Sequence, residues 1–186
     1  MVLVASDGLT AIEPPFGEVN YTLFFKPKSD ALLGEFNAFL AAYRQSEAFE
    51  DHIARLEAFD GTDYDGPDIP LTGTGPVLRV AIDAEGFPRS FPDTDEDVPI
   101  GFDLEALKAF ANERDYRLEF AVSNYEDIVF GLKAGIYDIG AGYLSDIFKN
   151  EVSAAGILLS DPLDSTSLYF FQKTQQNIRV AMEELE

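Results

Sequence analysis

Apolar residues recur along this chain in short runs, which are typical of strands, and at three- and four-residue intervals, which are typical of helices. Residues 21–26 are apolar on both faces, which predicts a strand inside a covered sheet. Ser29 is placed to cap a helix with a strongly apolar stripe: Leu32, Leu33, Phe36, Phe39, Leu40 and Tyr43. A second helix, from Ser46 to a stop at Gly61, presents a stripe of Phe49, Ile53, Leu56 and Phe59.

The segment from Gly61 to Pro76 differs from its surroundings, because it is rich in Gly, Pro, Asp and Thr and has no hydrophobic period. This composition indicates an exposed linker between two structural blocks. Alternation in the second block predicts an α/β fold, in which helices cover both faces of a mostly parallel sheet of about five strands. Its strands are expected at 78–83, 117–122, 137–142 and 167–173, and its helices at 103–113, 125–134 and 145–154.

Individual residues mark the ends of these helices. Asp103 is a candidate N-cap, and Gly135 is a candidate for the left-handed residue that follows a helix. The tail 177–186 has Ile178, Met182 and Leu185 on one face, which predicts a short helix. The first six residues lack the basic region and the full apolar stretch of a signal peptide, so no signal peptide is expected.

The chain of 186 residues has 34 acidic side chains against 13 Lys and Arg, and its net charge is −21. Such a charge repels phosphate backbones and anionic lipid headgroups, so we expect no nucleic-acid partner and no membrane-surface partner. No apolar stretch approaches the roughly 20 residues of a membrane helix, so no membrane insertion is expected. The absence of Cys excludes a disulfide framework, thiolate metal sites and thiol catalysis, but it leaves the compartment open.

Candidate catalytic and metal-binding groups are few. His52 is the one histidine, and it is interpreted as an ordinary surface imidazole on a helix. No Gly-x-Ser-x-Gly motif occurs, so no catalytic residue is predicted. The acidic run 93–97 begins like a calcium loop, but Val98 and Leu104 stand where that loop needs Gly and Glu. The sequence therefore predicts no metal site and no cofactor.

Five segments of the second block carry short motifs in a fixed order. They read Leu78-Arg-Val-Ala-Ile-Asp83 with Gly86-Phe-Pro-Arg-Ser-Phe91, Ile100-Gly-Phe-Asp-Leu104, Tyr125-Glu-Asp-Ile128 with Gly131-Leu-Lys-Ala-Gly135, Tyr137-Asp-Ile-Gly140, and Ser160-Asp-Pro162. In order and spacing they resemble the extracellular solute-binding proteins of family 3, the amino-acid receptors of ABC transporters. The resemblance covers residues 78–173.

The resemblance implies a single lobe of a type II periplasmic binding protein, in which two crossing strands join two lobes and the ligand lies between them. Residues 1–60 resemble the end of such a protein, a return hinge strand and closing helices, yet they precede its beginning in residues 78–186. The resemblance thus implies one lobe in permuted order, joined by the linker 61–77 into one compact α/β domain. Residues 21–25 and 167–171 are the expected hinge strands. The order comes either from a protein with tandem binding domains or from engineering.

The resemblance also implies which residues line the ligand. The rings of Phe87 and Phe91 would stack on an apolar or cationic group, and the turn Gly142-Tyr143-Leu144-Ser145 would offer backbone and hydroxyl groups. The same residues also fit structural roles, as core aromatic side chains and as a helix cap. The carboxylate-binding Arg of the family has no equivalent after the third strand. Lys149 offers a point charge there, and Arg89 is a candidate substitute.

These features lead us to expect a non-enzymatic solute-binding lobe of a periplasmic or extracellular receptor, which binds a small polar ligand such as an amino acid. A membrane transporter or a sensor protein is the expected partner, and the exposed cleft face is expected to self-associate. One alternative is a degenerate binding-protein fold that docks a protein. Another is an enzyme of the cyclohexadienyl dehydratase or lytic transglycosylase type, for which the sequence offers no catalytic constellation.

Overall fold

Five short strands form the central sheet of the computed structural model, which describes residues 9–93, 98–142 and 144–173. Across the sheet the order is β4-β3-β5-β2-β6; β2 is antiparallel to both of its neighbours, and the other pairs are parallel. Four of the five strands thus run in one direction, which confirms the mostly parallel sheet expected from the sequence. The strands are β2 (Phe24–Phe25), β3 (Val77–Asp83), β4 (Arg117–Ser123), β5 (Ile139–Ala141) and β6 (Leu158–Leu159).

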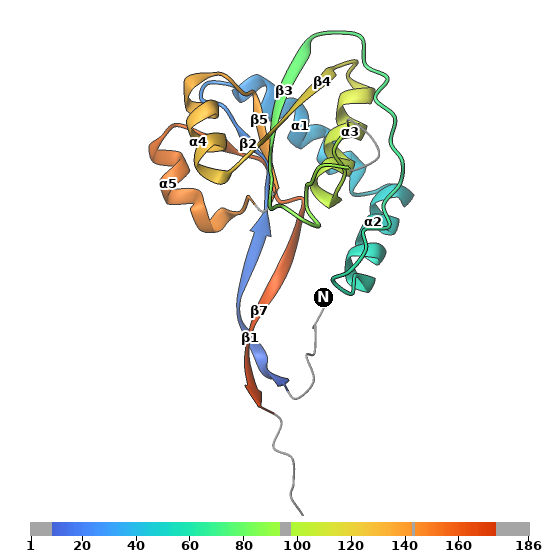
Figure 1. The fold of residues 1–186 in the computed structure, drawn as a ribbon, viewed down its shortest axis with the longest axis vertical. Helices are drawn as coiled ribbons and strands as arrows, with labels where there is room; N and C mark the ends of the chain where they lie inside the picture. Colours follow the sequence, from blue (N-terminus) through green and yellow to red (C-terminus); the bar gives the residue numbers. More distant parts are fainter. Residues whose placement is uncertain (1–8, 94–97, 143, 174–186) are drawn as a thin grey trace, which may run out of the picture.

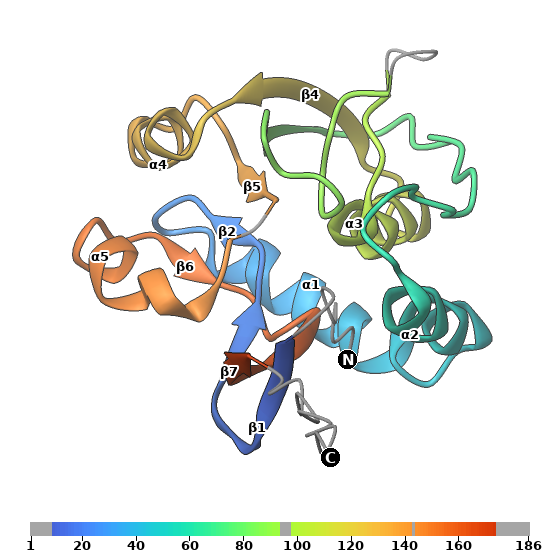
Figure 2. The ribbon, with the colours of Figure 1, turned by 60° about the horizontal axis from the view of Figure 1, so that its bottom comes forward.

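Helices cover both faces of the sheet, as predicted (Figure 2). Because successive strand residues point to opposite faces, Phe25 and Val80 join a buried cluster under α1 and α3, whereas Phe24 and Ala81 join a second cluster under α4 and α5. These helices are α1 (Asp30–Tyr43), α3 (Phe102–Glu113), α4 (Tyr125–Ala134) and α5 (Lys149–Ala154).

The larger buried cluster draws on residues from both sides of the linker. Phe36 of α1 is fully buried, and its ring centroid lies 5.6 Å from that of Phe25 and 5.2 Å from that of Phe110 in α3. Leu23 and Leu107 complete the same cluster. The segment before the linker therefore supplies a strand and a helix to the core of the segment after it.

A two-stranded ribbon of β1 (Leu9–Tyr21) and β7 (Asp164–Lys173) extends away from the body of the molecule (Figure 1). The strands pair antiparallel, with a register shift between Ile12 and Gly17. The predicted strand at 21–26 was wrong in extent, because β1 ends at Tyr21 and only Phe24–Phe25 enter the sheet. The other predicted hinge strand, at 167–171, lies within β7.

Two predicted helix ends, at Ser46 and Gly135, are confirmed, whereas α2 (Glu47–Ala58) ends at Ala58 and not at the predicted Gly61. Ser46 caps α2 by accepting from the Phe49 amide, and Gly135 ends α4 in the left-handed region with φ of 71°. The Ser29 hydroxyl instead donates to the Lys26 carbonyl and makes no cap hydrogen bond. Asp103 is the second residue of α3, so its predicted role as a cap was wrong.

Three features near the carboxyl terminus differ from the expectation. The helix expected at 145–154 is divided into a 3₁₀ turn, η1 (Asp146–Phe148), and α5. The short strand β6 has no counterpart in the hydrophobic pattern, because two residues are too few to show an alternation. The tail 177–186 lies outside the described residues.

The linker forms no helix or strand, as expected, but it is fixed to the second block by hydrogen bonds. The amide and hydroxyl of Thr72 donate to Asn112 Oδ1 over 2.9 and 3.1 Å. The Gly75 amide donates to the Asp115 carbonyl over 2.9 Å. The linker therefore follows α3 and the start of β4.

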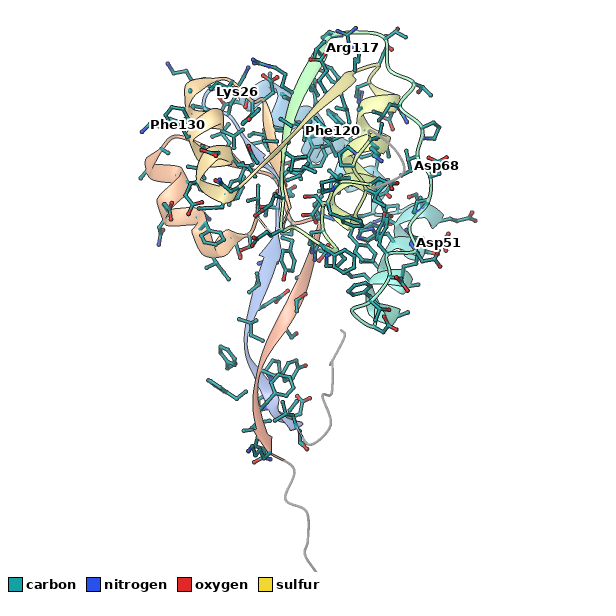
Figure 3. The ribbon with its side chains drawn as sticks, viewed as in Figure 1. Lys26, Asp51, Asp68, Arg117, Phe120 and Phe130 are labelled. Atoms are coloured by element: carbon teal, nitrogen blue, oxygen red, sulfur yellow. The ribbon has the colours of Figure 1, made fainter. Side chains whose placement is uncertain are left out.

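Charged side chains of the outer surface point to solvent, as Asp51, Asp68 and Arg117 illustrate (Figure 3). Phe130 of α4 is a large apolar exception, with 65% of its surface exposed. Within the described residues, no helix combines the length and the apolar character needed to span a membrane.

We predict that Phe36→Ala lowers the free energy of unfolding by about 3–5 kcal/mol, because it leaves a cavity between α1, α3 and β2. The matched control is Phe130→Ala, which removes an exposed ring and changes stability by about 0.5 kcal/mol or less. Urea denaturation of both variants measures the difference. Equal effects would contradict a core shared across the linker.

Candidate functional site

The carboxyl ends of β3 and β5 meet at one edge of the sheet, where the ribbon leaves the body (Figure 1). Ligands of open α/β sheets bind outside such an edge, which makes it the candidate functional site. Among the predicted ligand residues, Arg89 lies in the loop after β3, Gly142 follows β5, and Ser145 precedes η1. Tyr143 lies outside the described residues.

Asp103 of α3 brings two of these predicted residues together. Its carboxylate is fully buried and accepts from the Gly142 amide over 3.2 Å and from Arg89 Nη1 over 2.8 Å. Ser145 forms an isolated antiparallel bridge with Tyr21, and the Arg89 guanidinium lies 3.6 Å above the centre of the Tyr21 ring. The β3 loop, the β5 turn and the root of β1 are therefore directly linked.

Arg89 also holds the other strand of the ribbon. Its Nη1 donates to Asp164 Oδ2 over 2.6 Å, and its Nη2 donates to the second oxygen of the same carboxylate. This two-bond arrangement matches the planar fork of a guanidinium to a carboxylate. Since the side chain is only 4% exposed, Asp103 and Asp164 occupy the guanidinium that the sequence suggested for a ligand carboxylate.

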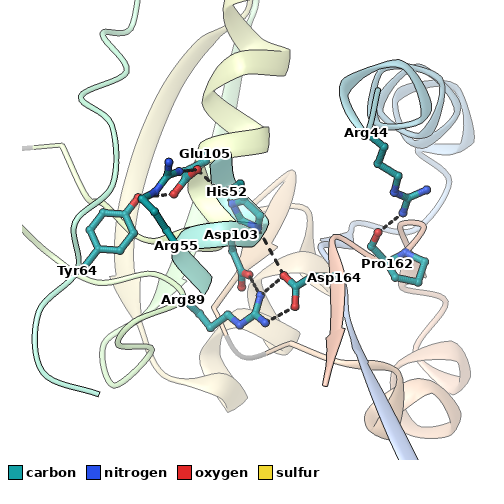
Figure 4. A network of polar contacts seen from close by, with 9 residues as sticks. All are labelled: Arg44, His52, Arg55, Tyr64, Arg89, Asp103, Glu105, Pro162 and Asp164. Atoms are coloured by element: carbon teal, nitrogen blue, oxygen red, sulfur yellow. Dashed lines mark hydrogen bonds and ion pairs between the residues drawn. The ribbon is translucent and has the colours of Figure 1, made fainter. Parts of the chain in front are cut away.

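The charged group continues into the protein through His52 (Figure 4). His52 Nδ1 lies 3.1 Å from Glu105 Oε2, and His52 Nε2 lies 3.8 Å from Asp164 Oδ2. Arg55 Nη2 and the Tyr64 hydroxyl donate to Glu105 over 2.6 and 2.9 Å. The interpretation of His52 as a surface imidazole was wrong, because its side chain is 4% exposed and lies between two carboxylates.

The pKa values of this group follow from burial and charge together. Burial acts to lower the pKa of His52, but hydrogen bonds to Asp164 and Glu105 outweigh it, so the pKa is raised. Burial acts to raise the pKa of Asp164, but Arg89 and His52 hold it below its usual value. For the fully buried Asp103, burial outweighs Arg89 and raises the pKa to about 6. The imidazole is thus favoured in its charged form, between two carboxylates.

Phe87 and Phe91 lie in an aromatic cluster at the side of this edge. Their ring centroids are 5.0 Å apart. The ring centroid of Phe59 lies 5.8 Å from that of Phe87, and the ring centroid of Tyr64 lies 5.7 Å from that of Phe91. Phe87 keeps 37% of its surface exposed, whereas Phe91 is half-buried. Phe87 is therefore the ring that remains open to a ligand.

Lys149, the remaining predicted residue, lies apart from Arg89. It lines a cleft of about 440 Å³ together with Asn20, Thr22 and Asp146. The Asp146 carboxylate in that cleft accepts from the amide and side chain of Asn20 over 3.1 and 2.7 Å. The structure thus brings Arg89, Gly142 and Ser145 to one edge, and it places Lys149 in a separate cleft.

A second cleft, which we call the α2 cleft, lies between α2 and the root of the ribbon and has a volume of about 450 Å³. Phe49, Ile53 and Leu56 of α2 line one side, and Arg89 and Asp164 also line it. Volumes of this size suit small organic ligands.

The sequence reasoning missed the roles of Asp103, Glu105 and Asp164. For Asp103 a local signal exists, because it lies in the family-like motif Ile100-Gly-Phe-Asp-Leu104. Nothing in the sequence distinguishes Glu105 and Asp164 from the other acidic residues, of which the chain has 34 in all. Their partners, His52 and Arg89, lie 53 and 75 positions away, so the pairing leaves no local pattern.

A family comparison agrees with the motifs found in the sequence. The sequence profile of the bacterial extracellular solute-binding proteins, family 3, matches residues 78–183, which is more than half of the chain. The chain belongs to this family. The resemblance stated from the five segments is thereby confirmed, and residues 1–77 lie outside the match. Among curated proteins, none matches the chain.

Two solved structures are similar to parts of this family 3 chain. An ancestral cationic amino acid solute binding protein is 36% identical with a TM-score of 0.31; the match covers 34% of this chain and 28% of that protein. The phosphate-binding protein of a phosphate ABC transporter from Streptococcus pneumoniae TIGR4 is 11% identical with a TM-score of 0.46, covering 84% of this chain and 52% of that protein. The matched regions thus span about half or less of these proteins.

The raised pKa of His52 predicts a specific pH dependence of stability. A group whose pKa rises on folding stabilises the folded protein fully at pH values below its unfolded-state pKa, which is about 6.5 for histidine. This stabilisation is lost as the pH rises through the folded-state pKa. We expect His52→Gln to cost about 2 kcal/mol of unfolding free energy at pH 6. The cost should shrink steadily above pH 6.5.

Urea denaturation of wild type and His52→Gln between pH 5.5 and 9 measures this cost. Since His52 is the one histidine of the chain, its imidazole NMR signals give its titration directly. A cost that stays constant or grows with pH would show that the imidazole is neutral in the folded protein.

Proposed function

We propose that this chain is a solute-binding lobe of a two-lobed receptor that acts outside the cytoplasmic membrane and serves an ABC transporter or a sensor. It binds a small polar ligand, with an amino acid as the leading class, and performs no chemistry on it. The single observation that carries the proposal is the ribbon of β1 and β7, which leaves the carboxyl edge of the sheet as a paired antiparallel connection. Such a connection suits two strands that cross to a second lobe.

The proposal includes a permuted order of one lobe. Residues 1–60 supply the return hinge strand and closing helices, 61–77 are the linker, and 78–186 supply the first part of the lobe. Two observations support it. The family match begins after the linker, at residue 78, and β2, from before the linker, inserts antiparallel between β5 and β6.

In this proposal the lobe supplies half of a ligand site at its carboxyl edge. The exposed ring of Phe87 offers an apolar surface, with Phe91 behind it. The hydroxyl of Ser145, which is buried at the same edge, is the polar group proposed to meet the ligand, whereas the Gly142 amide already donates to Asp103. Arg89 holds the ribbon rather than the ligand, because two carboxylates occupy its guanidinium. A ligand would bind this face first, and closure of a second lobe would complete its contacts.

One alternative has its own support, namely a docking module for a protein. The ribbon exposes Ile12, Phe16, Phe170 and Phe171, with 42%, 56%, 61% and 46% of their surfaces open, and the Phe16 and Phe170 rings stack at 4.2 Å. Exposed apolar clusters of this kind mark interaction surfaces. They also support self-association of the isolated chain.

A thermal-shift screen tests the proposal. The purified chain is mixed with amino acids, polyamines, small organic acids and phosphate, and light scattering on the same samples reports its size. We expect one chemical class to raise the Tm, because a ligand that binds only the folded state stabilises it by mass action. Phe87→Ala should reduce that shift at an unchanged ligand-free Tm, whereas Phe130→Ala should leave the shift intact.

Two outcomes count against the proposal. In one, no compound changes the Tm of the folded chain, and the chain captures a specific protein instead; this result favours the docking module. A collapse of the fold in Phe87→Ala would assign that ring to the core and remove it from the ligand face.

A further inference from the structure

The apolar stripe of α2 is poorly covered by the rest of the lobe. Phe49, Ile53, Leu56 and Phe59 lie on one side of this helix and are all half-buried. None of them belongs to either buried cluster of the sheet or is packed against one. The helix is tied to the lobe by polar contacts from His52 and Arg55 to Glu105. At its two ends, the rings of Phe49 and Phe59 contact those of Tyr43 and Phe102. An amphipathic helix normally buries its stripe, whereas this one stays half-buried, so part of it is open to a ligand.

The stripe faces the α2 cleft. On the other side, the cleft is lined by the roots of both ribbon strands, at Tyr21 of β1 and Ser165 of β7, and by Pro162 just before β7. Its volume of about 450 Å³ lies within the range of small-molecule sites, which are mostly apolar with a few well-placed polar groups. The apolar wall of this cleft is the α2 stripe.

The polar group that stands out in this cleft is Arg44, the residue that follows α1. Its Nη2 donates to the Pro162 carbonyl, and the other N–H groups of the guanidinium have no acceptor among the described residues. Among the arginines that the structure describes, Arg44 is the one without a carboxylate within 4.0 Å. In a chain with 34 acidic residues, this leaves a guanidinium suited to an external carboxylate.

We infer that the α2 cleft binds a small carboxylate with a branched or aromatic apolar body. The body lies on the stripe of Phe49, Ile53 and Leu56, and the carboxylate accepts hydrogen bonds from Arg44. The carboxylate of Asp164, which also lines the cleft, is compensated by Arg89 and His52. Glu57 is a second acidic residue that lines the cleft.

This site differs from the half-site at the carboxyl edge, because Gly142, Ser145 and Phe87 do not line it. It is complete within the lobe and needs no second lobe. A ligand in the α2 cleft touches the roots of β1 and β7 together with α2, so it favours whichever ribbon orientation gives it the better contacts. The inference therefore adds a site that acts on the ribbon, beyond the proposed solute-binding face.

Isothermal titration of the full chain with 3-phenylpropionate tests the inference, with its neutral amide and with acetate as comparison probes. We expect 3-phenylpropionate to bind and both comparison probes to bind much more weakly, since each lacks one of the two recognised groups. Arg44→Gln should weaken binding about tenfold, as expected for loss of hydrogen bonds to a charged group. The control Arg114→Gln, which removes an exposed guanidinium outside the cleft, should change nothing.

The location is read from amide NMR shifts on the same samples. Shifts confined to α2, Ser165 and Thr166 support the α2 cleft. Shifts centred on Gly142 and Ser145 would place the probe at the carboxyl-edge half-site, which would overturn this inference but not the proposed function. Absence of binding to a folded chain, or binding that survives Arg44→Gln unchanged, would overturn it as well. The inference would also be overturned if sedimentation shows a dimer and the NMR shifts show that the second copy covers α2.

Discussion

The buried guanidinium of Arg89 constrains the whole region where the ribbon meets the lobe. Placing a positive charge where only 4% of the side chain meets solvent is costly. It is tolerated here because the carboxylates of Asp103 and Asp164 accept three hydrogen bonds from the guanidinium. The Tyr21 ring lies against its face. Removing one partner of such a group leaves an uncompensated charge and typically costs about 3–5 kcal/mol. The loop after β3, α3, β1 and β7 are therefore held in one relative arrangement.

This constraint links the sheet edge to the ribbon. Asp103 receives the Gly142 amide on one oxygen and Arg89 on the other, while Arg89 reaches Asp164 at the start of β7. A change at the β5 turn can thus reach the ribbon through two charged side chains. In the proposed function, this link would carry ligand occupancy at the sheet edge to the connecting strands.

The sequence predicted elements with a strong local period well, and it predicted groups assembled by tertiary contact poorly. The helix at 125–134 was predicted with its observed bounds, because its apolar spacing and Gly135 are local signals. Strand β1 was missed because Pro14, Pro15 and Gly17 interrupt any alternation, and its side chains are mostly exposed. The buried state of His52 was missed because it depends on Glu105, 53 positions away.

The central claim, that Arg89 fixes the ribbon to the lobe, can be measured by the distance between one spin label on α4 and one at the end of β7. The chain has no Cys, so Glu126→Cys and Gln172→Cys give two unique labels at exposed positions. The account predicts one narrow distance distribution in the otherwise wild-type chain and a broad one when Asp164→Asn is added, with a folded sheet in both. Equal widths in the two proteins would contradict it.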